Sequence, residues 1–290
     1  MTLALLVLGT PGPVGAALVP RAHRAPDVPF ARAVPALDLT DPFDVRDVVQ
    51  EWARVVRSER PAARLVVVST GTGPVGQLLD EEAAFALNAA APAVLAAACA
   101  RLDARLLQLS TVEVFPGDGV QPYDVADPAA PRSRFGRTAL AGEQAVREIL
   151  PAGSWVVRIA QAYGADGPGL VGQLARRAVP EAGVTGPDTL ISPTWTRDLA
   201  DGLLGLCRSQ VPGGVLHAAA EACTLDELAG AVAGECGLAP GAPDGRSEPV
   251  GCWALSSRSW RDAGLPALPG WRTALAEAFR TEGPALRSAT

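Results

Sequence analysis

The sequence predicts an α/β protein with a doubly wound parallel sheet and a small α/β lobe at its C-terminal end. Short, continuous apolar runs, the first at residues 3–8, have the length and composition of strands buried on both faces. A glycine-rich turn follows the first run at once. Helical segments then alternate with apolar runs, which is typical of a parallel sheet covered by helices. The length of 290 residues accommodates one such unit with an appended lobe.

The net charge and the composition limit the classes of molecule that the protein is expected to bind. The net charge of −6 provides no basic face for nucleic acid. It leaves open a small neutral or cationic substrate, or an enclosed anion held by a few arginines. All 25 basic residues are arginine, so the chain offers no lysine for any chemistry. We therefore expect a small-molecule substrate and no nucleic acid.

The cysteines and the N-terminal residues indicate the cellular compartment of the protein. The 5 cysteines are widely spread and lack metal-ligand spacing, so we expect reduced thiols and no metal site. Glycine and proline follow the apolar residues 3–8 immediately, and no basic segment precedes them, so this run predicts a strand rather than a signal peptide. We expect no apolar run long enough to span a bilayer. These features predict a cytoplasmic protein without a membrane partner.

The glycine-rich turn is a candidate phosphate site. Gly9, Gly12 and Gly15 stand at every third position directly after the first predicted strand. Glycine is needed where the backbone turns sharply and approaches a pyrophosphate, and the helix that follows offers free N–H groups. Pro13 suits the first helical turn, where its missing N–H costs nothing, and Val14 follows it. A tight strand–helix turn without a ligand would give the same pattern.

The segments up to residue 101 carry further candidates. The second strand is poorly marked, and the first helix looks cut short by proline. Thr40 or Asp41 would cap a helix over about 44–58. A strand at 65–68 leads into small residues that let the backbone approach a cofactor, and an alanine-rich helix is expected over about 80–101. The candidate cofactor contacts in these segments are Asp38, Leu39, Ser69, Thr70, Gly71 and Asn88.

Arginines near the weak second strand bear on cofactor choice. Arg21, Arg24 and Arg32 would favour a 2′-phosphate if they face the site, and are otherwise solvated surface. No acidic residue is clearly placed at the end of a second strand to hold a ribose 2′-hydroxyl. The choice between NAD and NADP therefore stays open.

The strand over 106–110 delivers Ser110 and Thr111 at its carboxyl end. Ligands of parallel sheets gather outside this end of the strands, so we expect Thr111 to line the site. Glu113 lies just beyond, where an acid must be solvated or paired. It is a candidate general acid/base, and a salt bridge with a nearby arginine is the alternative.

Residues 110–115 and 135–143 resemble the active-site segment of the extended short-chain dehydrogenase/reductases, closest to the dTDP-4-dehydrorhamnose reductase group. That family typically shows S-T-D-Y-V-F and later Y-G-x-T-K-L-x-G-E. Phe135 stands where the family has its catalytic tyrosine, and Ala139 where it has its lysine. Phe135 has no exchangeable proton, and Arg137 is expected to point elsewhere on the helix. The resemblance implies a Rossmann domain, an NAD or NADP cofactor and no metal.

The resemblance continues to the C-terminal region. Residues 158–164 resemble R-x-x-x-V-Y-G, 191–200 resemble G-x-P-T-Y-T-x-D-L-A, and 213–217 resemble G-G-x-Y-H. We expect the Tyr163 hydroxyl to donate to a local partner, and Thr196 or Asp198 to cap a helix. The resemblance implies a Rossmann domain over 1–165, to which the chain returns near 190–217, and a substrate lobe over 166–290. The implied substrate contacts are Ser110, Phe135, Gln161, Tyr163 and Trp195.

Three functions remain open at this point. The first is a reductase of a nucleotide-sugar or natural-product ketone, in which Thr111, Glu113 or a water replaces the tyrosine. The second is a cyclase, lyase or isomerase of secondary metabolism that reuses the pocket without redox chemistry. The third is a catalytically silent nucleotide-binding accessory protein. A homodimer is compatible with the resemblance, although no interface is legible in the sequence.

Overall fold

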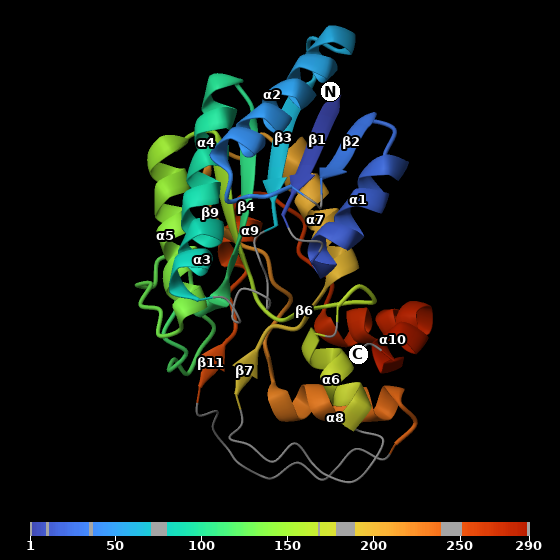
Figure 1. Cartoon of the computed structure of the whole chain (residues 1–290). Coiled ribbons are helices and arrows are strands. Elements are labelled where there is room, and N and C mark those ends of the chain that lie inside the picture. The colour runs from blue at the N-terminus through green and yellow to red at the C-terminus, as the bar shows by residue number, and fades with distance from the viewer. Residues whose placement is uncertain are drawn as a thin grey trace.

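The computed structural model describes residues 2–9, 12–34, 37–70, 80–167, 169–177, 189–238 and 251–288. Its centre is a parallel sheet in the order β2-β1-β3-β4-β5-β9. The carboxyl ends of these strands point toward a smaller lobe (Figure 1). The strands are β1 (Leu3–Leu8), β2 (Phe30–Val34), β3 (Arg64–Ser69), β4 (Arg105–Thr111), β5 (Ser154–Ile159) and β9 (Gly214–His217).

Helices cover both faces of this sheet, so the predicted doubly wound fold is confirmed (Figure 1). Alternate residues of each strand enter different cores. Leu5 and Val7 pack on the side of α1 and α7, while Leu6 and Leu8 pack on the side of α2, α4 and α5. This double burial is why the strands read as continuous apolar runs. The helices are α1 (Pro13–Arg24), α2 (Pro42–Glu59), α4 (Ala91–Arg101), α5 (Arg134–Ile149) and α7 (Thr196–Arg208).

The strand order reverses beside β1, which lies between β2 and β3. Beyond β3 the strands continue outward to β9 on one side only. In sheets of this kind ligands bind in the crevice outside the carboxyl ends of the strands at such a switch point. The carboxyl ends of β1 and β3 are therefore where this topology places a cofactor.

Two early elements differ from the sequence expectation. Helix α1 continues through Pro20 to Arg24, so the expectation that it is cut short is wrong. Strand β2 lies at the edge of the sheet, with Arg32 and Ala33 exposed, which explains its weak apolar pattern. The cap of α2 is confirmed, because the Asp41 carboxylate accepts hydrogen bonds from the backbone N–H groups of two residues in its first turn.

The predicted helix over 80–101 contains a π turn. It consists of α3 (Glu81–Phe85), the π turn η2 (Ala86–Ala90) and α4. By length and composition alone, Glu81–Arg101 could cross a membrane, contrary to the expectation that no such segment exists. Half of its most apolar window is buried, and it packs against α2 and α5, so we interpret it as a core helix of the fold.

The lobe is assembled from segments on both sides of β9 in the chain. Small sheets β10-β7-β11 and β6-β8 lie among its helices. Thr224 and Glu227 form a capping box that starts helix α8. The elements of the lobe are β6 (Ala162–Tyr163), α6 (Gly169–Arg177), β7 (Leu190–Ile191), β8 (Thr194–Trp195), β10 (Cys223–Thr224), α8 (Leu225–Glu235), β11 (Cys252–Trp253) and α10 (Trp271–Ser288).

Candidate functional site

The glycine turn lies at the switch point, between β1 and α1. Gly9 has a φ of 123°, which side chains with a Cβ rarely adopt. Gly12 is the N-cap of α1, and it provides no side-chain cap, so the first N–H groups of the helix are suited to an anion. A Cβ on Gly15 would touch Thr70 at 3.4 Å, and Val14 is buried. Pro13 occupies the first helical turn, as expected.

The other predicted cofactor residues lie along the same edge. Ser69 is buried at the end of β3, and the Thr70 hydroxyl donates to the Leu8 carbonyl at 3.3 Å. Gly71 lies outside the described residues. Asp38 accepts hydrogen bonds from the hydroxyl and the N–H of Thr40, at 2.6 and 2.9 Å, and these bonds lower the pKa of Asp38.

The remaining candidate residues of this region lie in the core, in an ion pair or at the surface. Leu39, the neighbour of Asp38, packs in the core beside α2. Arg21 forms an ion pair with Asp201 at 2.7 Å, while Arg24 and Arg32 are exposed. The exposure of Arg24 and Arg32 fits the solvated-surface alternative.

Asn88 lies in the π turn and connects it to α5. Its side-chain N–H donates to the Thr138 hydroxyl at 3.0 Å, and the residue is buried. A Cβ on Gly142 would stand 2.0 Å from the Asn88 carbonyl oxygen, so the π turn and α5 are in direct contact. Asn88 therefore has the satisfied surroundings of a core polar residue, and its cofactor contact stays a prediction.

Hydrogen bonds of Glu113 link the end of β4 to the start of α5. The Thr111 hydroxyl accepts a bond from the Glu113 N–H at 3.2 Å and caps the short 3-10 turn η3 (Val112–Val114). The Ser133 hydroxyl donates to the Glu113 carboxylate at 2.7 Å and accepts from the Gly136 N–H at 2.9 Å. Thr111, Glu113 and Ser133 are thus linked at the N-terminus of α5.

Sequence reasoning did not assign Ser133 a role in the site. The signal was present, because serine directly before a helix is a preferred N-cap. Gly136 explains how closely the two elements approach. A Cβ at Gly136 would lie 2.1 Å from the Glu113 carbonyl oxygen, so only glycine lets α5 start against η3.

Phe135 and Ala139, which we expect at the positions of the family's tyrosine and lysine, lie in the first turns of α5. Phe135 is partly buried, and Ala139 packs against a buried apolar cluster that contains Val112 and Phe115. Arg137 is exposed and donates to the Arg132 carbonyl at 3.0 Å. Arg137 therefore points away from Ala139, as predicted.

Gln161 joins two segments of the lobe. Its amide N–H donates to the Trp253 carbonyl at 3.1 Å, and its amide oxygen accepts from the Ser192 N–H at 2.9 Å. Tyr163 is 1% exposed and, among the described residues, its hydroxyl has no hydrogen-bond partner. The expectation that it donates to a local partner is wrong. Burial, together with the nearby Asp198, raises the pKa of Tyr163.

Trp195 belongs to the core of the lobe. It is buried, and its indole N–H donates to the Glu282 carboxylate at 3.2 Å. Trp195 is also the N-cap residue of α7, without a side-chain cap, so the expected cap by Thr196 or Asp198 is wrong. Burial raises the pKa of Asp198 to about 6. The substrate contacts of Gln161, Tyr163 and Trp195 stay predictions.

A buried polar network behind β4 was not foreseen from the sequence. Glu143 of α5 and Arg158 of β5 form an ion pair at 2.7 Å with side chains 3% and 7% exposed. The Ser110 hydroxyl donates to Glu143, and Arg158 lies 3.5 Å from the fully buried His217. The signal was an arginine and a histidine within apolar strands, where charged groups need partners.

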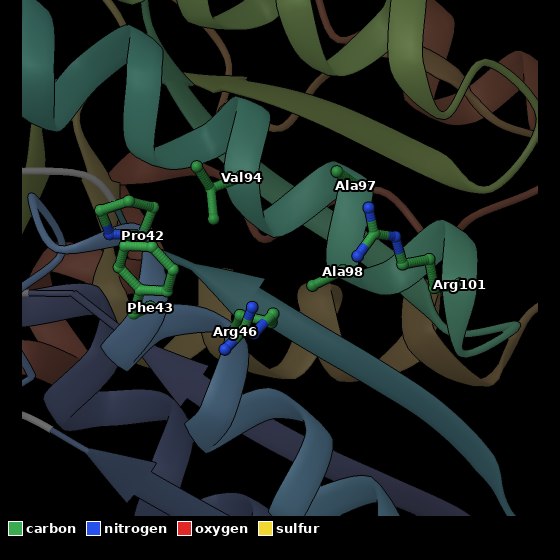
Figure 2. Close-up of a pocket in the computed structure, with 7 residues that line it drawn as sticks. All are labelled: Pro42, Phe43, Arg46, Val94, Ala97, Ala98 and Arg101. Atoms are coloured by element: carbon green, nitrogen blue, oxygen red, sulfur yellow. The ribbon is translucent and has the colours of Figure 1, made fainter.

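A groove lies away from the crevice, between α2 and α4 (Figure 2). It encloses about 220 Å³, and the ring of Phe43 at its rim is 65% exposed. Within the described part of the chain, no group of three or more potential metal ligands is present. The residues that line the groove are Pro42, Phe43, Arg46, Val94, Ala97, Ala98 and Arg101.

The sequence is similar to a family model and to known proteins. Residues 3–282 match the family model described as the RmlD substrate binding domain. The chain is 37% identical over 292 residues to dTDP-4-dehydrorhamnose reductase of Streptomyces griseus, covering 94% of this chain and 92% of the relative. It is 36% identical over 286 residues to a probable dTDP-4,6-dihydroxy-2-methyloxan-3-one 4-ketoreductase of Streptomyces antibioticus, covering 94% of each.

A solved structure shows the same fold. It is dTDP-4-dehydrorhamnose reductase from Bacillus anthracis str. Ames in complex with NADP, with a TM-score of 0.78, 22% identity and coverage of 97% of this chain and 98% of that one. The fold is that of the extended short-chain dehydrogenases/reductases. Within that class, the chain belongs to the RmlD substrate-binding domain family, whose similar members are named as dTDP-sugar reductases.

Proposed function

We propose that this protein is an NAD(P)-dependent reductase of nucleotide-linked 4-keto-6-deoxy sugars in which Thr111, Glu113 and Ser133 replace the family's tyrosine and lysine. The observation that carries this proposal is the hydrogen-bonded chain of these three residues at the start of α5. The names of the relatives support the substrate class. We also propose a tailoring role in secondary metabolism and a cytoplasmic location.

The residues of the crevice fit a nicotinamide dinucleotide. Gly9 has the backbone conformation of a phosphate turn, and α1 presents uncapped N–H groups beside it. When bound, such a cofactor supplies a hydride to the carbonyl carbon. Ala139 gives up the ribose contact of the family's lysine, so we expect weaker cofactor binding than in relatives that have it. Gly9, Gly12 and Gly15 would line the pyrophosphate.

The chain's own contribution is the proton. The oxygen of Thr111 accepts a backbone N–H, which leaves its O–H to donate to the carbonyl oxygen of a substrate. Ser133 would pass its proton to the carbonyl oxygen as that oxygen takes up the electron pair of the C=O π bond. Glu113 would then relay a proton from solvent to Ser133 across their 2.7 Å contact. Phe135 would form an apolar wall beside these groups.

Glu113→Gln tests this function directly. The amide still accepts the Ser133 hydrogen bond but has no acidic proton, so turnover should fall about 10²-fold or more. The assay follows NADPH and NADH oxidation with a dTDP-4-keto-6-deoxy sugar. Glu148→Gln, a change to an exposed residue at the far end of the same helix, is the matched control and should keep full turnover. Equal turnover in both variants would remove Glu113 from the mechanism.

The non-redox alternative is favoured by one observation, the apolar character of Phe135 and Ala139. A cyclase, lyase or isomerase could use Thr111 and Glu113 without a hydride donor. Titration of NADPH and NADH against the folded protein separates the two, because the reductase requires binding. Binding without turnover of any sugar would support a silent accessory role instead.

A further inference from the structure

The inference concerns the buried ion pair of Glu143 and Arg158. The Arg158 Nε–H lies 3.0 and 3.2 Å from the two carboxylate oxygens, and a terminal N–H group donates at 2.7 Å. The pair therefore has the geometry that compensates two charges removed from water. A buried ion pair is weak evidence for stability, because apolar residues of similar volume often serve as well. A specific placement is needed to explain it.

The pair and its two partners come from four elements. The Ser110 hydroxyl of β4 donates to Glu143 of α5, and the guanidinium of Arg158 in β5 lies 3.5 Å from Nε2 of His217 in β9. Burial and the Arg158 charge lower the pKa of His217 to about 4, so the imidazole is neutral. Its Nδ1 lies 3.2 Å from the Tyr123 carbonyl oxygen, to which it would donate.

The network holds both ends of the segment that carries the proposed proton donors. Ser110 directly precedes Thr111. At the other end, Phe115 follows η3, and the Arg158 guanidinium lies over its ring at 5.0 Å. The same ring stacks on Tyr123 with centroids 4.4 Å apart. Residues 110–115 are therefore anchored at each end to one buried charge pair.

We propose that Glu143 and Arg158 are positioning residues that fix the turn over 110–115 against α5, and with it the Thr111 hydroxyl and the Glu113 carboxylate. Ser110 is the link, because its hydroxyl hydrogen is given to Glu143 and is not available to a substrate. This role rests on the proposed function for its catalytic consequence. The placement of residues 110–115 does not depend on it.

Ser110→Ala is the test, because it detaches the turn and leaves the ion pair intact. Ser154→Ala is the matched control. Ser154 is a buried serine at the opposite end of the neighbouring strand, where its hydroxyl donates to the Leu150 carbonyl at 2.7 Å. The readouts are kcat and KM with the dTDP-sugar, and amide hydrogen exchange of residues 111–115. The Phe115 N–H, bonded to the Val112 carbonyl at 3.0 Å, reports on the turn.

In Ser110→Ala we expect kcat to fall roughly tenfold or more with little change in KM, because small misplacements of catalytic groups are costly. Exchange over 111–115 should become faster than in Ser154→Ala. An unchanged kcat, or exchange no faster than in the control, would overturn the proposal. A wild type without turnover would instead overturn the proposed function, and the exchange comparison alone would then decide whether Ser110 positions the turn.

Discussion

At the scale of single residues, His217 shows how burial sets chemistry. Its ring is fully buried beside the Arg158 guanidinium, and both burial and that positive charge disfavour protonation. The neutral ring keeps one N–H for the Tyr123 carbonyl oxygen and one lone pair toward Arg158. A charged imidazole at this position would face a cation without a compensating acid among the atoms it contacts.

The pH dependence of stability should carry this signature. The pKa of His217 is about 4 in the folded protein, against 6.5 for a free side chain. Between these pH values the unfolded chain binds a proton at His217 that the folded chain does not bind. The free energy of unfolding therefore falls by about 3 kcal/mol as the pH drops from 6.5 toward 4. Urea unfolding of wild type and His217→Asn at several pH values measures the difference. A gap between them that stays constant with pH would contradict the assignment.

The sequence predicted Thr111 at the carboxyl end of its strand because strand order alone places it there. It did not predict the orphan hydroxyl of Tyr163, since a motif letter carries no information on which partners surround a side chain. Ser110 was expected at the substrate, but its partner Glu143 is thirty-three residues away in the chain. Such a contact depends on the packing of α5 against β4, which residue patterns do not encode.

At the scale of elements, glycines set how closely helix α5 packs. A Cβ would meet backbone oxygen at 2.1 Å from Gly136 and at 2.0 Å from Gly142. Backbone cannot move aside as a flexible side chain does, so a methyl group at either position displaces the helix. These two positions hold α5 against η3 at its start and against the π turn η2 further along.

Alanine at these glycines should therefore destabilise the protein. We expect Gly136→Ala and Gly142→Ala each to cost about 1–3 kcal/mol through overpacking. Gly205 in α7 is the control, because a Cβ there meets nothing within 4 Å. Gly205→Ala should stabilise the helix by about 0.5–1 kcal/mol, the usual gain over glycine inside a helix. Chemical denaturation of the three variants tests this, and a shared sign of effect would contradict it.

Elements buried on both faces were predictable, and elements at edges were not. β1 and β3 lie in the middle of the sheet and need apolar residues throughout, while β2 has neighbours on one side only. The π turn around Asn88 left no trace in the sequence because alanine fits every helical geometry. Its Nδ2 bond to Thr138 shows that the turn is stabilised by a partner on another helix.

At the scale of the whole molecule, the segment over 117–123 is hydrogen-bonded to the lobe. The Gly117 carbonyl accepts from the Cys252 N–H at 3.0 Å, and the Tyr123 N–H donates to the Ala254 carbonyl at 3.0 Å. The Trp253 ring packs directly on Gly117, whose φ is 80°. The loop that follows the candidate site is thus bonded to strand β11.

Gly117→Ala should loosen this junction. Its Cβ would stand 2.1 Å from the Trp253 ring, in addition to the strain of a positive φ. Gly237→Ala is the control, because Gly237 has a φ of 77° but nothing within 4 Å of its Cβ. Hydrogen exchange over 116–123 and 252–256 should become faster only in Gly117→Ala. Equal exchange of these residues in both variants would contradict a role of the contact between Gly117 and Trp253.

The return of the chain to the sheet has a consequence for recombination between related genes. Between the lobe strands β8 and β10, the chain forms helix α7, which covers one face of the sheet, and then the edge strand β9 of that sheet. A single crossover ahead of β8 that imported a relative's lobe would also replace that helix and strand, and set foreign side chains against the resident β5 and α1. Exchange of the lobe as a whole would therefore disturb the packing of the sheet, whereas single substitutions within the lobe would leave that packing unchanged.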